Sequence, residues 1–139
     1  MTRYLVSLCL VVVPTLGFAQ STILYCPNPS TITITKQPYN EPWRQYAYSA
    51  IIPADLPQYG NQLELVGQGE DNALGSMIFA TWTDHTFLCW YKGYSSDQVI
   101  ASAQTLDHYR CVFPTSSGSP YDCTSNDPKA CPLECTLNE

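Results

Sequence analysis

Basic residues are scarce in this 139-residue chain, which holds 6 lysines and arginines against 12 aspartates and glutamates. The formal net charge is −6, and the few basic residues are scattered along the sequence rather than clustered. A protein this acidic repels phosphate groups, so nucleic acids and anionic membrane surfaces are poor partners. The composition therefore predicts that the protein does not bind nucleic acid.

Long apolar runs are missing after the first twenty residues, and the apolar run at the start is shorter than the roughly 20 residues that a membrane-spanning helix needs. Arg3 opens that segment, and the small residues Gly17 and Ala19 stand where a signal peptidase reads. Residues 1–19 are therefore predicted to be a cleavable signal peptide. We expect an exported protein, periplasmic or extracellular, with no membrane span after signal cleavage and with residues 20–139 as a single domain.

Cys-x-x-Cys motifs are also absent, although six cysteines follow the predicted cleavage site. Redox proteins typically use that spacing, whereas three residues separate Cys131 from Cys135. Zinc sites need four cysteine or histidine ligands in close pairs, which the C-terminal region does not offer. An even number of cysteines in a short exported chain instead predicts a disulfide framework without cofactor or metal. The six predicted disulfide cysteines are Cys26, Cys89, Cys111, Cys123, Cys131 and Cys135.

Strand geometry favours one disulfide among the possible pairings. Folding residues 109–123 into a hairpin about Ser117 places Cys111 opposite Cys123, on the same face of both strands. Directly opposed residues have Cα atoms about 4.5–5.5 Å apart, which is a distance that a disulfide can span. We therefore predict a bond between Cys111 and Cys123.

The C-terminal tail, from about residue 124 to residue 139, has few apolar residues of its own. Such a segment is poorly ordered unless it is tied down. We expect Cys131 and Cys135 each to bond either Cys26 or Cys89, in an order that the sequence leaves open. A bond between Cys131 and Cys135 is not expected, because so small a ring removes little chain entropy.

Strand-forming residues fill the windows between the 11 prolines and 7 glycines. Residues 31–36, TITITK, alternate strictly, which predicts a half-buried strand with Ile32 and Ile34 on one face. Further strands are expected at 45–52, 62–68, 76–83, 86–92 and 109–113, while 98–105 is open between strand and helix. The windows 76–83 and 86–92 are apolar on both faces, so Trp82 and Trp90 are expected in the core. The pattern predicts an all-β fold, a small disulfide-stabilised β-sandwich or barrel in a single domain.

Four short motifs resemble those of a family of small exported, cysteine-containing bacterial proteins that is classed only as a domain of unknown function. They are Cys26-Pro27, Trp43 with the aromatic residues that follow it, FLCWY at 87–91 and the closing CPLEC at 131–135. The resemblance covers nearly all of the chain after residue 19, and it implies a compact β-domain held by disulfides. It implies no activity. This chain departs from the family in its additional tail cysteines and its longer tail.

Two Asp-His dipeptides, Asp84-His85 and Asp107-His108, are the candidates for metal binding or acid–base chemistry. Brought together in a sheet, two imidazoles and two carboxylates would suit zinc or copper. Either histidine could instead pair with Ser95 and be oriented by an aspartate, as in a hydrolase, although the Gly-x-Ser-x-Gly motif is absent. The dipeptides are also typical of solvated strand ends. A small secreted hydrolase or a metal-binding protein is therefore the alternative function.

Aromatic residues carry the main functional prediction. The chain has 10 tyrosines and 3 tryptophans, more than a small core must bury. Their rigid rings cover a large contact area at little entropic cost. The richest stretch is 38–48, where Trp43, Arg44 and Tyr46 form the candidate contact surface, unless Trp43 merely covers one end of the fold. We expect a non-enzymatic binding protein whose partner is another protein or a glycan.

Overall fold

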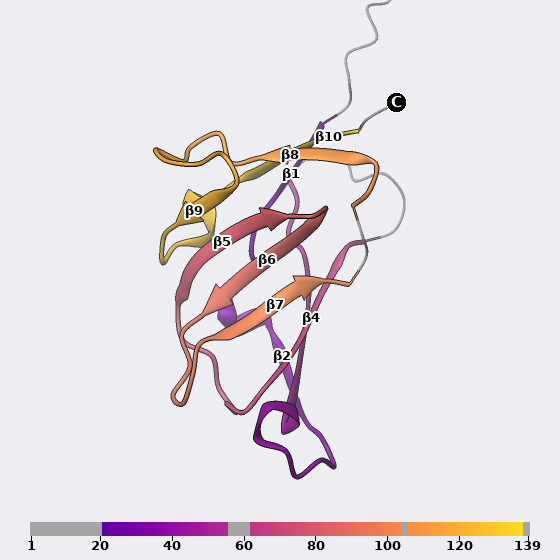
Figure 1. The fold of residues 1–139 in the computed structure, drawn as a ribbon, viewed down its shortest axis with the longest axis vertical. Coiled ribbons are helices and arrows are strands. Elements are labelled where there is room, and N and C mark those ends of the chain that lie inside the picture. The colour runs from indigo at the N-terminus through magenta and orange to yellow at the C-terminus, as the bar shows by residue number, and fades with distance from the viewer. Residues whose placement is uncertain (1–20, 56–61, 104–105, 138–139) are drawn as a thin grey trace, which may run out of the picture.

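Two antiparallel sheets make up the computed structural model, which describes residues 21–55, 62–103 and 106–137 (Figure 1). The larger sheet has seven strands, in the spatial order β2 (Thr33–Lys36), β3 (Tyr46–Ile51), β4 (Glu64–Gly69), β7 (Gln98–Ser102), β6 (Thr86–Tyr91), β5 (Met77–Thr83) and β9 (Asp122–Thr124). The smaller sheet has three, in the order β1 (Ser21–Leu24), β10 (Leu133–Leu137) and β8 (Tyr109–Val112). Short 3-10 turns occupy η1 (Pro29–Thr31), η2 (Pro42–Arg44) and η3 (Pro128–Ala130). The prediction of a single all-β domain with disulfides is confirmed.

Every window predicted as a strand contains one. The ambiguous window 98–105 contains β7 in its first five residues, and residues 104–105 lie outside the described part of the chain. The predicted signal peptide, 1–19, also lies outside it. Strands β1, β9 and β10 were not predicted, because each is short and interrupted by polar residues or cysteine, so no alternation stands out.

The C-terminal tail contains a central strand. β10 pairs with β1 on one side and with β8 on the other, and Leu133 and Cys135 are fully buried. The tail therefore completes the smaller sheet, which its low apolar content did not suggest.

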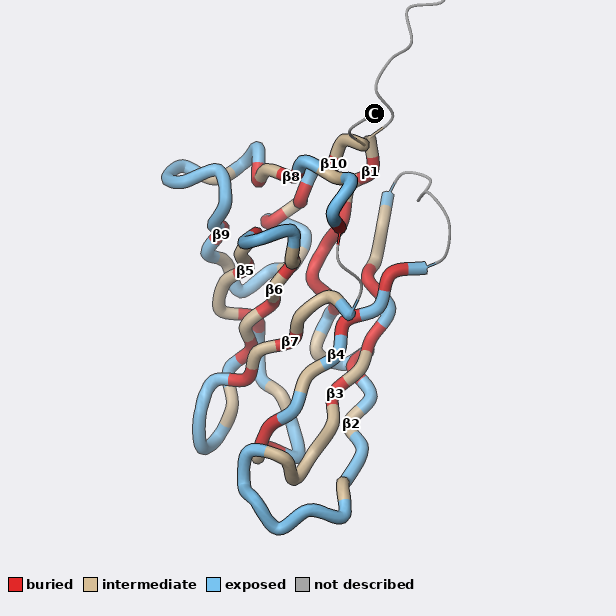
Figure 2. The backbone as a smooth tube through the Cα atoms, turned by 45° about the vertical axis from the view of Figure 1, so that its right-hand side comes forward, coloured by how far each residue is buried: buried red, intermediate tan, exposed pale blue. Residues whose placement is uncertain are grey.

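The core lies between the facing sides of the two sheets, and Figure 2 shows buried residues along the strands and exposed residues in the loop that precedes β3. Each large apolar side chain buried there contributes about 1.5–3 kcal/mol to stability. The largest fully buried aromatic side chains are Tyr48, Phe87, Tyr91 and Phe113.

The two tryptophans expected in the core differ. Trp82 is 8% exposed and belongs to it, as predicted. Trp90 lies on the outer face of the larger sheet, where it is only partly buried and stacks on Phe79 with ring centroids 4.9 Å apart. The expectation for Trp90 was wrong because strand side chains alternate: Cys89 and Tyr91 point inward, so Trp90 points outward.

The predicted disulfide pairing was wrong, although all six cysteines are oxidised. The structure joins Cys26 to Cys89, Cys111 to Cys135 and Cys123 to Cys131. The corresponding Cα–Cα distances are 5.8, 4.1 and 5.7 Å. As expected, Cys131 and Cys135 do not bond each other.

The pairing differs because residues 109–123 do not form the predicted hairpin. Strand β8 pairs with β10, which places Cys111 directly opposite Cys135. Strand β9 instead pairs with β5 at the edge of the other sheet. Cys123 then lies near Cys131 in the segment that leads into β10, and Cys26 and Cys89 are left to bond each other across the two sheets.

Candidate functional site

Three loops lie at the same end of the larger sheet, the lower end in Figure 1, and we call them the loop end. They are residues 37–45, which contain η2, residues 70–76 between β4 and β5, and residues 92–97 between β6 and β7. The strand register explains why they meet: Tyr46 pairs with Gly69, and Tyr91 pairs with Gln98, so these strands begin and end side by side.

A buried carboxylate holds two of these loops together. Asp71 is 3% exposed, and its Oδ1 accepts hydrogen bonds from the backbone N–H groups of Tyr94 and Ser95, both at 3.1 Å. Its Oδ2 accepts one from Nε2 of Gln98 at 2.8 Å. The hydroxyl of Tyr48 donates to the Asp71 carbonyl at 2.6 Å and accepts from its N–H at 3.1 Å. The loops are therefore anchored to strands β3 and β7.

Close packing around Asp71 requires glycine at two positions. A Cβ atom at Gly69 would overlap the Gln98 amide, and one at Gly93 would overlap the Asp71 carboxylate. Burial raises the pKa of Tyr48 to about 12, so its hydroxyl stays protonated and can donate at neutral pH. The region beneath the loop end is therefore a tightly packed polar cluster, which limits the movement of the loops above it.

Aromatic side chains stand exposed on two of the three loops, 37–45 and 92–97. Trp43 is 62% exposed, Tyr94 86% and Tyr39 41%. The Arg44 guanidinium carbon lies 3.7 Å from the ring centroid of Tyr39 and 5.3 Å from that of Trp43. Such cation–π contacts fix the guanidinium and the rings relative to one another.

The predicted contact residues are thus brought together only in part. Trp43 and Arg44 form one cluster with Tyr39, whereas Tyr46 is half-buried at the start of β3 and packs against the core. Sequence reasoning missed Tyr94, the most exposed of the large hydrophobic side chains described. The sequence did contain a clue to this exposure. Tyr94 is a lone aromatic residue in the loop sequence Gly93-Tyr94-Ser95-Ser96, where no strand pattern would bury it.

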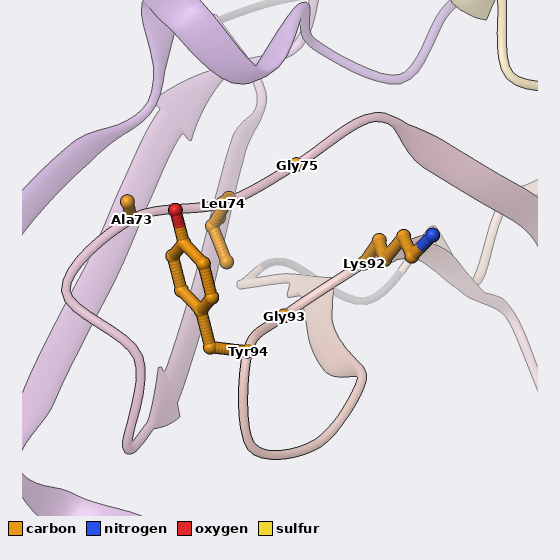
Figure 3. Close-up of a pocket in the computed structure, with 6 residues that line it drawn as sticks. All are labelled: Ala73, Leu74, Gly75, Lys92, Gly93 and Tyr94. Carbon is orange, nitrogen blue, oxygen red and sulfur yellow. The ribbon is translucent and has the colours of Figure 1, made fainter.

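Two concave surfaces lie among these loops. The first, which we call the Trp43 groove, encloses about 350 Å³. The second, the Tyr94 hollow, encloses about 270 Å³, and Figure 3 shows the Tyr94 ring beside Ala73 and Leu74, with the Lys92 amine pointing away. The groove is lined by Pro42, Trp43, Gln68, Gly69, Glu70, Ser96, Asp97, Gln98 and Val99.

The Asp-His dipeptides lie at the other end of the larger sheet. Asp84 and His85 form the two-residue turn between β5 and β6, with φ angles of 48° and 61°, as a type I′ hairpin turn requires. The Leu106 N–H donates to the His85 carbonyl at 3.0 Å, so Asp107-His108 follows nearby. Within the described ranges, however, no group of three or more His, Cys, Asp or Glu residues is placed to hold a metal ion.

The hydrolase pairing around Ser95 is not formed. Ser95 lies in the loop after β6, and His85 lies in the turn before it, so the six residues of β6 separate them by about 20 Å. His108 lies near the His85 end. The backbone N–H of Ser95 donates to Asp71, which is a structural contact.

No protein-family model matches this chain, and neither the curated proteins nor the solved structures give a match. No helix in the described residues is both long enough and apolar enough to cross a membrane. The three disulfides are consistent with an oxidising compartment.

Proposed function

We propose that this protein is an exported, disulfide-stabilised β-domain that binds a protein or glycan partner through its loop end. The observation that carries the proposal is the exposure of Trp43 and Tyr94 at one end of the larger sheet, where the buried Asp71 carboxylate anchors the loop that carries Tyr94. Tryptophan and tyrosine are enriched among residues that dominate binding energy. Because the loops are already ordered, binding loses little conformational entropy.

Export is supported by two independent features. Three disulfides are typical of proteins that fold in an oxidising compartment, the periplasm or the extracellular space. Residues 1–19 have the composition of a signal peptide. An exported domain with exposed aromatic side chains is suited to binding other molecules outside the cytoplasm.

The replacement of Trp43 by alanine tests the proposal. Because the side chain is 62% exposed, we expect Trp43→Ala to melt within a few degrees of the wild type. Loss of a hot-spot residue costs about 2 kcal/mol or more in binding, so partner affinity should fall by about 30-fold or more. Thermal melts and quantitative capture from envelope and host extracts and from glycan arrays, with the mature oxidised protein, measure the two effects.

Two variants serve as controls. Tyr121→Ala removes an aromatic side chain of similar exposure, 51%, at the opposite end of the sheet, and should bind normally. Trp82→Ala truncates a core residue and should cost about 3–5 kcal/mol of stability. A folded Trp43→Ala protein that captures as much of each partner as Tyr121→Ala would contradict the proposal.

A further inference from the structure

Two carboxylates, those of Glu70 and Asp97, line the Trp43 groove. Strands β4 and β7 pair Leu65 with Ser102 and Val66 with Ala101. Glu70 follows the last residue of β4 and Asp97 precedes the first residue of β7, so both lie at the same end of this strand pair. Two carboxylates that line one groove give it a negative charge, which favours a cation.

No basic residue lines the groove to neutralise this pair. Glu70 accepts a hydrogen bond from the Ser96 hydroxyl at 3.4 Å, and neither carboxylate is in an ion pair with another described residue. Arg44, which follows Trp43 in the chain, contacts the Tyr39 and Trp43 rings and is not among the residues that line the groove. The groove therefore combines two uncompensated negative charges with an exposed indole ring.

We propose that the Trp43 groove binds a lysine or arginine side chain from a basic segment of another protein. This inference rests on the function proposed above and identifies the chemistry of the partner. A cation in the groove would pair with the Glu70 and Asp97 carboxylates and would lie beside the exposed Trp43 indole, which Arg44 also contacts. The negative charge of the whole chain, −6, would attract such a segment over a longer range.

The surface beside the groove fits the rest of such a segment. Val99 lines the groove and pairs with Trp90 on the next strand, and Trp90 in turn pairs with Phe79. All three are partly exposed on the outer face of the larger sheet. Apolar side chains that flank the basic residue would lie against this row. The expected partner segment is therefore basic and apolar, not uniformly charged.

A cation explains the groove better than the other ligand classes. A neutral sugar would use the indole ring and the polar side chains, but it would leave the two negative charges of the groove without a counter-charge. A divalent metal would need more acidic or histidine ligands than Glu70 and Asp97, and no such group is present in the described residues. The charge complementarity favours an ammonium or guanidinium group.

The experiment uses a short acetylated peptide of alternating lysine and valine, and a matched peptide with glutamine in place of lysine. Each is titrated into the isotopically labelled, oxidised mature protein, and binding is followed by NMR. We expect the lysine peptide to shift the Trp43 indole signal and the amides of residues 68–70 and 96–99. Affinity should fall by about tenfold or more between about 20 and 300 mM salt, and the glutamine peptide should bind about tenfold more weakly or worse.

A pair of charge variants isolates the groove. Glu70→Gln/Asp97→Asn removes both charges and should weaken binding of the lysine peptide about tenfold or more, while leaving the melting temperature unchanged or higher. Asp107→Asn/Glu134→Gln makes the same change in net charge at exposed positions outside the groove, and should bind like the wild type.

The outcomes separate this inference from the proposed function. Three results would show that the groove does not bind a cation. They are equal binding of the two peptides, no binding of either peptide, and an equal loss of binding in both double variants. Capture of a partner that is lost in Trp43→Ala but retained in Glu70→Gln/Asp97→Asn would also overturn this inference, and would leave the loop end as the binding surface. If neither Trp43→Ala nor Glu70→Gln/Asp97→Asn reduced the capture of a partner, both the cation-binding inference and the proposed function would be wrong.

Discussion

Asp71 positions the loop end through its carboxylate and its backbone. Oδ1 accepts hydrogen bonds from the Tyr94 and Ser95 amides, and Oδ2 accepts one from Gln98. These hydrogen bonds satisfy both oxygens of the buried carboxylate. A residue that sequence analysis did not single out therefore sets the geometry of the site.

Asp71→Ala should destabilise the protein by about 1–3 kcal/mol, because it leaves the buried Gln98 amide without its carboxylate acceptor. Urea unfolding measures the change, and hydrogen exchange should show faster exchange in residues 92–97. Asp107→Ala, which alters an exposed aspartate, is the control and should stay within about 0.5 kcal/mol of the wild type. Equal unfolding midpoints for the two variants would refute the role of Asp71.

Buried tyrosines predict sensitivity to alkali. Burial raises the pKa of Tyr48 to about 12 and also raises that of Tyr91, whose hydroxyl donates to the Pro27 carbonyl at 2.5 Å. In the unfolded chain both would titrate near 10. Their contribution to stability is therefore fully present below about pH 10 and is lost as the pH rises from there towards 12.

We expect thermal melting temperatures to fall steeply above about pH 10, with tyrosinate absorbance rising together with unfolding. Tyr48→Phe should reduce this dependence, although it lowers stability at neutral pH by removing the hydrogen bonds to Asp71. Tyr121→Phe, at an exposed position, should keep the wild-type profile. A Tyr48→Phe profile parallel to that of the wild type would show that Tyr48 does not contribute.

At the scale of the elements, the three disulfides connect different parts of the fold. Cys26–Cys89 connects the segment after β1 to β6, and Cys123–Cys131 connects β9 to the segment before β10, so both join the two sheets. Cys111–Cys135 crosses neighbouring strands within the smaller sheet. They close segments of very different length, with sequence separations of 63, 24 and 8 residues for Cys26–Cys89, Cys111–Cys135 and Cys123–Cys131.

Their contributions to stability should follow these separations. The loop-entropy model gives about 4 kcal/mol for Cys26–Cys89, about 3.5 for Cys111–Cys135 and about 2.5 for Cys123–Cys131 at 25 °C. Denaturant unfolding of the three paired Cys→Ala variants tests the order. If removal of Cys123–Cys131 cost the most, native packing around that bond rather than unfolded-chain entropy would dominate.

At the scale of the whole molecule, the three disulfides together are comparable to the net stability of a domain. Each is typically worth about 2–4 kcal/mol, against a net stability of roughly 5–15 kcal/mol. Full reduction and alkylation should therefore lower the melting temperature by tens of degrees, as followed by circular dichroism. A protein alkylated without prior reduction is the control. Identical melts of the two samples would show that the disulfides are dispensable.

Local patterns in the sequence determined the kind of structure. Alternation in TITITK placed Ile32 in the core and Ile34 against it, and β-forming windows predicted six of the strands, while the window that contains β7 was left open between strand and helix. Trp43, which the sequence offered either as a contact residue or as a cover over one end of the fold, is 62% exposed. These properties depend on which residues are neighbours along the chain, so periodicity and turn residues suffice to predict them.

Only the tertiary structure decided which distant segments meet. Because β10 lies between β1 and β8, Cys135 faces Cys111. Because β9 pairs with β5, Cys123 is separated from β8, the strand that was expected to face it. The Asp71 cluster likewise joins residues from three separate segments of the chain. Such pairings are chosen by how the two sheets bury their faces together, which depends on long-range packing and loop closure that no local pattern contains.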